Sequence, residues 1–187
     1  MSALLVREDC VLLLVDLQER LAPAIQDNAR VVARCRLLAA AARTLGVPIL
    51  VSEQYPQGLG PTVAALAAEL GDAPRFAKLE FSCAAVPSIV EAVRATGRHT
   101  LVLGGMEAHV CVLQTAVGFR ALGLSVVVVA DATGSRREES RSLAFARARS
   151  AGCGVVDSEM VVFEWLGRAG TPEFKTLAPW IRAGGPP

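Results

Sequence analysis

The chain has 187 residues and a formal net charge of +1, because 19 lysines and arginines nearly balance 18 aspartates and glutamates. This length suits one domain whose core can fold without disulfides or metal. The absence of a basic excess argues against a nucleic acid or a membrane surface as partner. We therefore expect one domain over residues 1–187 that binds neither nucleic acid nor a membrane.

Apolar runs of strand length alternate with segments of helical periodicity in the first half of the chain. Continuous apolar residues predict buried strands, and recurrence at helical spacing predicts helices. The glycines and prolines of EQYPQGLGP predict a rim loop without regular structure, which carries Tyr55. The predicted elements are a strand at Cys10 to Val15, a helix from about Ala29 to Leu45, a strand at Val47 to Ser52, a helix at Thr62 to Leu70, a strand at Arg75 to Leu79 and a helix at Ala84 to Ala95.

The second half continues the alternation. Its predicted elements are a strand at Thr100 to Leu103, a strand at Leu124 to Ala130, a helix from a capping box of Ser135 and Glu138 to about Ala151, a strand at Gly154 to Val156, a helical segment at Met160 to Trp165 and a C-terminal helix. Strands that alternate with helices predict βαβ units and one parallel sheet. The predicted fold is a three-layer α/β/α sandwich with a Rossmann-like parallel sheet, centred on the strands that contain Val11, Ile49, Leu101 and Val126.

The five cysteines are scattered, and no two form a C-x-x-C pair. This pattern indicates neither a disulfide framework nor a zinc site. The N-terminal segment MSALLVRED lacks the design of a signal peptide, and no apolar run is long enough to span a bilayer. We expect a protein of the reducing cytoplasm, where a free thiol survives.

One of these cysteines follows a strand at a position suited to chemistry. Gly104 and Gly105 predict a sharp turn after the strand, and Cys111 falls in the first turn of the helix that follows. Ligands bind at the carboxyl ends of the strands in open α/β sheets, and a helix N-terminus favours a thiolate. Cys111 is therefore a candidate nucleophile, although a small buried residue that packs between helix and strand is the alternative.

Two further polar residues stand where predicted strands end. Asp16 follows the first strand and Lys78 lies near the end of the third, so parallel strands would bring both to the edge that holds Cys111. An ammonium stabilises a thiolate, and a carboxylate can accept the thiol proton and return it to a leaving amine. Each residue alone has a structural alternative, as a cap, a solvated charge or a core residue.

Four segments that span nearly the whole chain carry a resemblance to a known family. VLLLVDLQERL, FAKLEFS, GGMEAHVCVLQTA and VVVVADATGSR resemble, in order, the segments of the isochorismatase-like cysteine hydrolases, a family that includes nicotinamidase and N-carbamoylsarcosine amidase. EQYPQGLGPT and GMEAHVCVLQTA are similar to the subgroup of isochorismatase domain-containing proteins.

The resemblance implies roles for particular residues. Cys111 would be the nucleophile, Asp16 the general base and then acid, and Lys78 the cation that lowers the thiol pKa. A cis peptide between Met106 and Glu107 would aim the N–H of Glu107, together with that of Cys111, at an oxyanion. The resemblance implies cleavage of a C–N bond in a small amide through a thioester. Members of the family commonly form homo-oligomers, so a homo-oligomer is also expected.

Other positions bear on the substrate and on cofactors. Gln18, Tyr55, Phe81 and His109 are candidate substrate contacts, with structural alternatives for Phe81 and His109. Nicotinamidases hold a metal near the second strand, where this chain has Ser52, Glu53 and Gln54, and the chain has only two histidines. Too few metal ligands remain, so we expect no metal and no other cofactor.

Two functions of other classes remain open. A non-catalytic oligomeric scaffold or binding protein could retain the fold, although a lysine and an aspartate are costly to bury without use. Cys111 could also act as a redox-sensing thiol, with Cys83 approaching it in space. The C-terminal helix, with Phe174, Leu177 and Trp180, either forms an interface between subunits or packs on its own domain.

Overall fold

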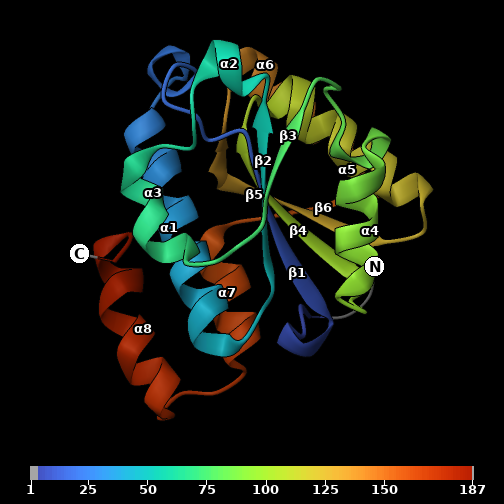
Figure 1. Ribbon diagram of the computed structural model, residues 1–187. Helices are drawn as coiled ribbons and strands as arrows, with labels where there is room; N and C mark the ends of the chain where they lie inside the picture. The colour runs from blue at the N-terminus through green and yellow to red at the C-terminus, as the bar shows by residue number, and fades with distance from the viewer. Residues whose placement is uncertain (1–3, 187) are drawn as a thin grey trace.

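A six-stranded parallel sheet forms the centre of the computed structural model, which describes residues 4–186 (Figure 1). The strand order is β3-β2-β1-β4-β5-β6, so the four strands predicted to be central are β2, β1, β4 and β5. Residues 1–3 and 187 of the predicted domain lie outside the described residues. The strands are β1 (Cys10–Val15), β2 (Ile49–Gln54), β3 (Arg75–Lys78), β4 (Thr100–Met106), β5 (Ser125–Gly134) and β6 (Gly154–Val156).

Helices cover both faces of this sheet, which confirms the three-layer α/β/α prediction. The helices α1, α3, α7 and α8 pack against one face, and α4, α5 and α6 pack against the other (Figure 1). The helices are α1 (Asn28–Leu45), α2 (Pro56–Leu59), α3 (Ala64–Leu70), α4 (Pro87–Ala95), α5 (Leu113–Ala121), α6 (Glu138–Ser150), α7 (Ser158–Leu166) and α8 (Pro172–Ala183). Short 3₁₀ turns lie at η1 (Arg7–Asp9), η2 (Ala22–Ala24) and η3 (Cys83–Ala85), and a π-helical turn lies at η4 (Ala108–Val112).

The central strand β1 supplies both layers of the core. All of its residues are buried, and alternate side chains point to opposite faces of the sheet. Leu12 and Leu14 join the core beneath α1, whereas Val11 and Leu13 join the core that contains Phe119 of α5. Burial on both faces explains why this strand is a continuous apolar run in the sequence.

The last helix, α8, packs on its own chain. Leu177 is fully buried in the core beneath α1, and Phe174 and Trp180 pack partly buried against the same core. Of the two alternatives for this segment, the structure therefore favours packing within the domain. None of the helices in residues 4–186 is both long and apolar enough to cross a membrane.

The glycines after the predicted strand at Thr100 to Leu103 do not form a turn. Strand β4 continues through both to Met106, so the predicted turn at Gly104 and Gly105 is wrong. A Cβ atom on Gly105 would lie 2.0 Å from the carbonyl oxygen of Val15, and the φ angle of Gly105 is +139°. The glycine is required because β1 and β4 approach each other closely at the end that carries the candidate site.

Two other predicted features differ from the structure. The segment EQYPQGLGP is not free of regular structure, because Glu53 and Gln54 extend β2 and Pro56–Leu59 forms a helical turn with proline at its start. Ser135 does not cap α6, which begins at Glu138 without a side-chain cap. The hydroxyl group of Ser135 contacts His109 instead.

Burial of the cysteines predicts a loss of stability at alkaline pH. Burial raises the pKa of all five thiols, that of Cys10 to about 11 and that of Cys35 further. Unfolded thiols lose their protons near pH 8.5, so above that pH the unfolded state binds fewer protons and stability falls as pH rises. Replacing Cys35 by alanine should reduce this slope by about 1.4 kcal/mol per pH unit between pH 9 and 10, measured by urea unfolding. Parallel slopes for parent and variant would contradict the prediction.

Candidate active site

Asp16 lies directly after β1 at the carboxyl edge of the sheet. Its backbone is left-handed, with φ of 55°, a conformation that aspartate tolerates better than most residues. The side chain is fully buried, and both carboxylate oxygens are occupied. Oδ1 accepts a hydrogen bond from Oγ of Ser52 at 2.7 Å, and Oδ2 accepts one from Nζ of Lys78 at 2.8 Å. These two hydrogen bonds therefore fix the orientation of the Asp16 carboxylate.

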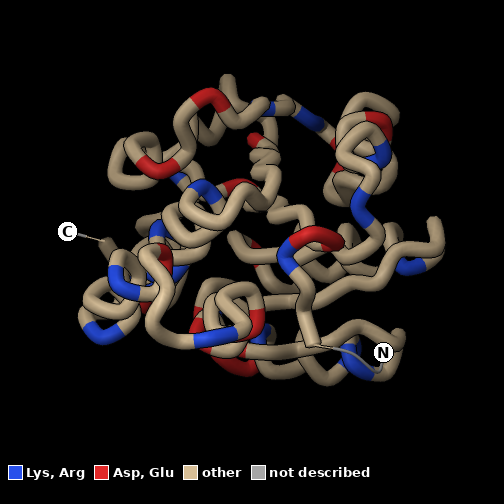
Figure 2. Tube along the Cα trace, turned by 90° about the horizontal axis from the view of Figure 1, so that it is seen from below, with Lys and Arg blue, Asp and Glu red and all other residues tan. Residues whose placement is uncertain are grey.

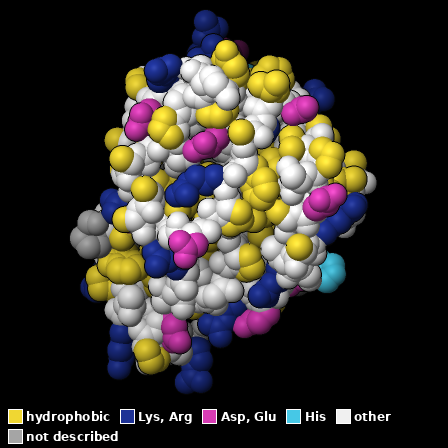
Figure 3. All heavy atoms as spheres, viewed as in Figure 1, with side chains coloured by type: hydrophobic (Ala, Val, Ile, Leu, Met, Phe, Trp, Pro, Cys, Tyr) yellow, Lys and Arg dark blue, Asp and Glu magenta, His cyan; other side chains and the backbone are white. Residues whose placement is uncertain are grey.

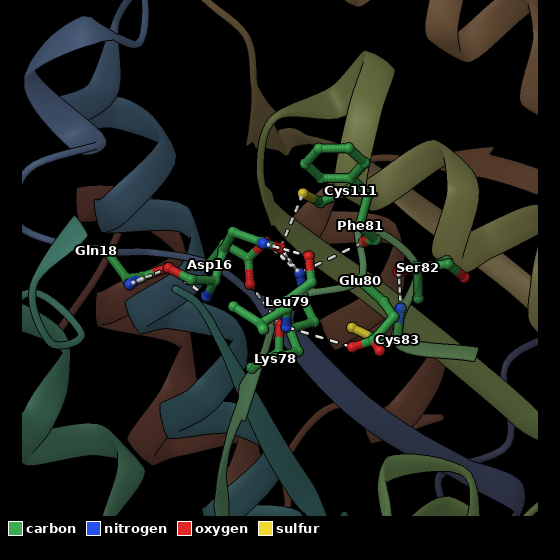
Figure 4. A network of polar contacts seen from close by, with 12 residues as sticks. Asp16, Gln18, Lys78, Leu79, Glu80, Phe81, Ser82, Cys83 and Cys111 are labelled. Atoms are coloured by element: carbon green, nitrogen blue, oxygen red, sulfur yellow. Dashed lines mark hydrogen bonds and ion pairs between the residues drawn. The ribbon is translucent and has the colours of Figure 1, made fainter. Parts of the chain in front are cut away.

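Lys78, the last residue of β3, forms a buried ion pair with Asp16 (Figure 4). The register that aligns Lys78 with Gln54 of β2 brings the ammonium to this edge. Its Nζ also donates to Oε1 of Gln54 at 2.6 Å and to the carbonyl oxygen of Phe81 at 3.4 Å. A buried ammonium is stable only when paired and hydrogen-bonded, and here all three of its protons have oxygen partners.

Cys111 enters the site from the π-helical turn that follows β4. The N–H of Val112 donates to the carbonyl oxygen of Glu107 at 3.2 Å, five residues back, and α-helical bonding resumes in α5. Cys111 is 6% exposed, and its Sγ lies 3.9 Å from Oε1 of Gln54. The side chain directly after β1, the last side chain of β3 and a side chain of the turn after β4 therefore converge, as Figure 4 shows for Asp16, Lys78 and Cys111.

The environment of the Cys111 thiol raises its pKa. Burial is the largest cause, the Asp16 carboxylate adds to it, and the positive charge of Lys78 acts in the opposite direction. This rise acts against the thiolate that a helix terminus and a neighbouring ammonium are expected to favour. Burial disfavours the charged form because the sulfur has little contact with water. At neutral pH the sulfur is a thiol with a carboxylate in its immediate environment.

The segment between β4 and Cys111 carries a second polar network. The peptide bond between Met106 and Glu107 is cis, at the position that the resemblance indicated. The buried Glu107 carboxylate accepts a hydrogen bond from Nε of Arg136 at 2.8 Å through Oε1, and its Oε2 lies 3.1 Å from Nδ1 of His109. His109 also lies 3.0 Å from Oγ of Ser135. The His109 ring is thus held by protein groups.

Gln18 is placed to hold a loop rather than to contact a substrate. The residue is fully buried. Its Nε2 donates to the carbonyl oxygens of Gln54 and Gly60, and its Oε1 accepts from the N–H of Gln54. Because these bonds use the side-chain amide, the predicted substrate contact does not fit this structure. Gln18 instead links the end of β1 to the segment that carries Tyr55.

Tyr55 and Phe81 both lie half-exposed beside the buried pair. The N–H of Tyr55 donates to the carbonyl oxygen of Lys78, and the carbonyl oxygen of Phe81 accepts from Lys78 Nζ. Their side chains are 52% and 53% exposed, respectively. Both residues therefore carry exposed rings on segments whose backbone groups bond to Lys78.

The positions that correspond to the metal ligands of nicotinamidases have other partners here. Ser52 donates to Asp16, Glu53 accepts from the N–H and hydroxyl of Thr62, and Gln54 accepts from Lys78. Within residues 4–186, no group of three His, Cys, Asp or Glu side chains is arranged to hold a metal ion.

The sequence indicates Ser52 and Gln54 only as positions that correspond to the metal ligands of nicotinamidases, and it does not indicate Arg136 as a site residue. The signal for Ser52 and Gln54 was their place at the end of β2, next to the strand that leads to Asp16. No periodic pattern indicates which side chains will meet across neighbouring strands. The contact of Arg136 with Glu107 depends on the path of the chain after β5, which extends to Gly134 rather than ending at Ala130.

A parallel α/β sheet with a buried carboxylate, ammonium and thiol at its carboxyl edge defines an α/β protein with a site suited to nucleophilic chemistry. The isochorismatase domain family matches residues 10–160. The chain is 37% identical to isochorismatase domain-containing protein 2A of Mus musculus over 176 residues, 94% of this chain and 84% of the relative. It is also 37% identical to isochorismatase domain-containing protein 1 of Salmo salar, where it covers 60% of the relative's length.

Two solved structures share the fold. A structure described as the MAR1 ribonuclease from Caenorhabditis elegans is 35% identical with a TM-score of 0.92, over 99% of this chain and 95% of that one. The YcaC gene product from Escherichia coli, described as an octameric hydrolase of unknown specificity, is 28% identical with a TM-score of 0.89, over 95% of this chain and 90% of that one. This chain therefore belongs to the isochorismatase family and has its hydrolase fold.

Proposed function

We propose that this protein is a cysteine hydrolase that cleaves a C–N bond of a small amide through a thioester, without a metal. The observation that carries the proposal is the buried ion pair of Asp16 and Lys78, 2.8 Å apart, in the immediate surroundings of the Cys111 thiol. Burying two charges costs several kcal/mol before their attraction is counted. A role of both groups in catalysis would explain why the protein buries them at this site.

The reaction follows from the chemistry of these three groups. The thiol proton moves to the Asp16 carboxylate as the sulfur attacks the amide carbon, while Lys78 stabilises the negative charge on sulfur. The N–H groups of Glu107 and Cys111 are the proposed donors to the oxyanion. Asp16 returns the proton to the leaving nitrogen, and the C–N bond breaks to give an amine and a thioester. Water then cleaves the thioester and restores the thiol.

Tyr55, Phe81 and His109 are the proposed substrate contacts around this site. The first two have exposed rings on segments whose backbone groups bond to Lys78, and His109 lies two residues before the proposed nucleophile. Large apolar groups on a surface often mark a contact site for a ligand or a second subunit. A small, uncharged or weakly polar amide fits such a rim better than a polyanion.

We also propose that the protein forms a homo-oligomer. Hydrophobic side chains gather over the region of β3 and α5 in the view of Figure 3, and Leu79, Phe81 and Val117 are among the exposed apolar residues. The E. coli relative in structure is described as octameric. Size-exclusion chromatography with light scattering would give the molar mass, and a mass of one chain at micromolar concentration would contradict the proposal.

The nucleophile is tested by Cys111→Ser. The variant should lose alkylation by iodoacetamide at this position, and ammonia release from a panel of small primary amides should fall by about 10³-fold or more. Cys153→Ser is the control, because it changes a buried thiol elsewhere and should retain the parent's activity. A parent that releases no ammonia from any amide of the panel would favour the scaffold alternative.

Cleavage of RNA is a second candidate, because the C. elegans structure at 35% identity is described as a ribonuclease. The charge distribution argues against it. Blue and red segments are interspersed along the trace in Figure 2, and the net charge is only +1. A labelled RNA incubated with the parent and with Cys111→Ser decides the point. Cleavage by the parent alone would replace the amidase proposal.

A further inference from the structure

The amide group of Gln54 is fixed in one orientation. Its Nε2 donates to the carbonyl oxygen of Leu79 at 2.8 Å, so its Oε1 must face the opposite way, toward Lys78. The backbone of Gln54 is held as well, because its N–H and carbonyl groups both bond to the Gln18 amide. Rotation of the amide by 180° would place its NH₂ group against the Lys78 ammonium, where neither group can accept a proton.

The oxygen of this amide lies between the cation and the nucleophile. Among the three partners of Lys78 Nζ, Oε1 of Gln54 is the closest, at 2.6 Å, and the others are Asp16 Oδ2 and the carbonyl oxygen of Phe81. The same Oε1 is the acceptor 3.9 Å from the Cys111 sulfur. An ammonium has three protons, so in the resting structure none remains for the sulfur.

We propose that Gln54 is a positioning residue that keeps Cys111 as a thiol in the resting protein. Its oxygen accepts from the thiol and occupies the Lys78 proton that would otherwise stabilise a thiolate. When the thiol proton passes to Asp16, Lys78 exchanges its bond to Gln54 for one to the sulfur, and no proton is gained or lost by the site. This inference rests on the proposed function, because it assigns Lys78 the stabilisation of the thiolate.

Charged and titratable groups face the Cys111 thiol from three different elements. Asp16 faces it from the end of β1, Lys78 from β3 and Cys83 from η3. Asp16 and Cys83 disfavour the thiolate and Lys78 favours it. Gln54 is neutral, so it acts by directing the Lys78 proton and not by adding a charge.

Two substitutions at this position should act in opposite directions. Gln54→Glu places a carboxylate between Lys78 and the sulfur, so the pH midpoint for alkylation of Cys111 by iodoacetamide should rise by about one unit. Gln54→Leu removes the acceptor and frees a Lys78 proton, so the midpoint should fall by about one unit. Mass spectrometry of the labelled peptides gives the rate at Cys111 alone. Gln57→Glu is the matched control, because the same change is made on an exposed side chain three residues away.

The outcomes separate this inference from the proposed function. Opposite shifts at Gln54, with no shift in Gln57→Glu, would support it, whereas a general loosening of the site would move both Gln54 variants in the same direction. If Lys78→Ala slows alkylation but neither Gln54 variant shifts the midpoint, or both shift alike, the role of Gln54 is excluded and the hydrolase proposal stands. If Lys78→Ala and Asp16→Asn also leave the midpoint unchanged, the proposed function itself fails.

Discussion

Asp16→Asn should abolish amide hydrolysis, with a loss of about 10³-fold or more, because the thiol then has no carboxylate to accept its proton. The substitution also leaves the Lys78 ammonium buried without its counter-charge. Removing one partner of a buried pair costs about 3–5 kcal/mol of unfolding free energy. Urea unfolding and ammonia release, measured on the same preparation, test both expectations.

A second variant separates chemistry from folding. Asp16→Asn combined with Lys78→Met removes both charges, so it should recover most of the lost stability, since a buried ion pair contributes little net free energy. The activity should stay lost. A double variant that is stable and hydrolyses amides at the parent's rate would exclude Asp16 and Lys78 from the reaction.

Asp27→Asn is the matched control for the single variant. Asp27 also has a left-handed backbone, with φ of 54°, but its carboxylate is exposed and pairs with Arg30 at the surface. Exposed ion pairs contribute between about 0 and 1 kcal/mol, so this variant should keep nearly full stability and full activity. A loss as large as that of Asp16→Asn would show that the backbone conformation, and not the buried pair, is responsible.

Gly105→Ala should destabilise the fold by about 3 kcal/mol or more, or prevent folding altogether. The new Cβ would lie 2.0 Å from the carbonyl oxygen and 2.7 Å from the nitrogen of Val15, so β1 and β4 would have to separate. Val15 precedes Asp16, and the separation would therefore displace the carboxylate from the site. Urea unfolding gives the stability, and the alkylation rate of Cys111 reports on the site.

Gly97→Ala provides the comparison for that substitution. Gly97 has φ of +68°, but nothing lies within 4 Å of the position that a Cβ would take. The variant should lose only the cost of placing alanine in a left-handed conformation, about 1–2 kcal/mol. Equal losses in the two variants would mean that the close approach of β1 and β4 is unimportant for stability.

The sequence predicted the position of each principal site residue because strand ends are visible in it. The apolar run that ends at Val15 placed Asp16 at the sheet edge, and β-branched residues before Gly104 placed Cys111 near the same edge. The strand β3 is short and mostly exposed, but the polar residue at its end was also placed correctly. These predictions require only the pattern of apolar residues and the rule that the carboxyl ends of parallel strands lie at the same edge of the sheet.

The contacts between side chains could not be predicted in this way. That Gln54 faces Lys78, and that Ser52 faces Asp16, depends on the register between strands, which alternation alone does not specify. The raised pKa of the Cys111 thiol depends on how much water reaches the sulfur, and no local pattern encodes that. The two glycines predict a turn in the sequence, but glycine permits both a turn and a close approach of strands, so the pattern cannot distinguish the two.

The direction in which the Cys111 side chain points depends on the number of residues in the π-helical turn at Ala108–Val112. Successive residues of an α-helix are rotated by about 100° around its axis, so one residue more or less re-aims every side chain that precedes the regular helix. A deletion within this turn that kept all the proposed catalytic residues would allow an ordinary helix to form and would turn Cys111 away from Asp16. A change in the spacing between Glu107 and Leu113 should therefore abolish the proposed reaction without substitution of any reactive group.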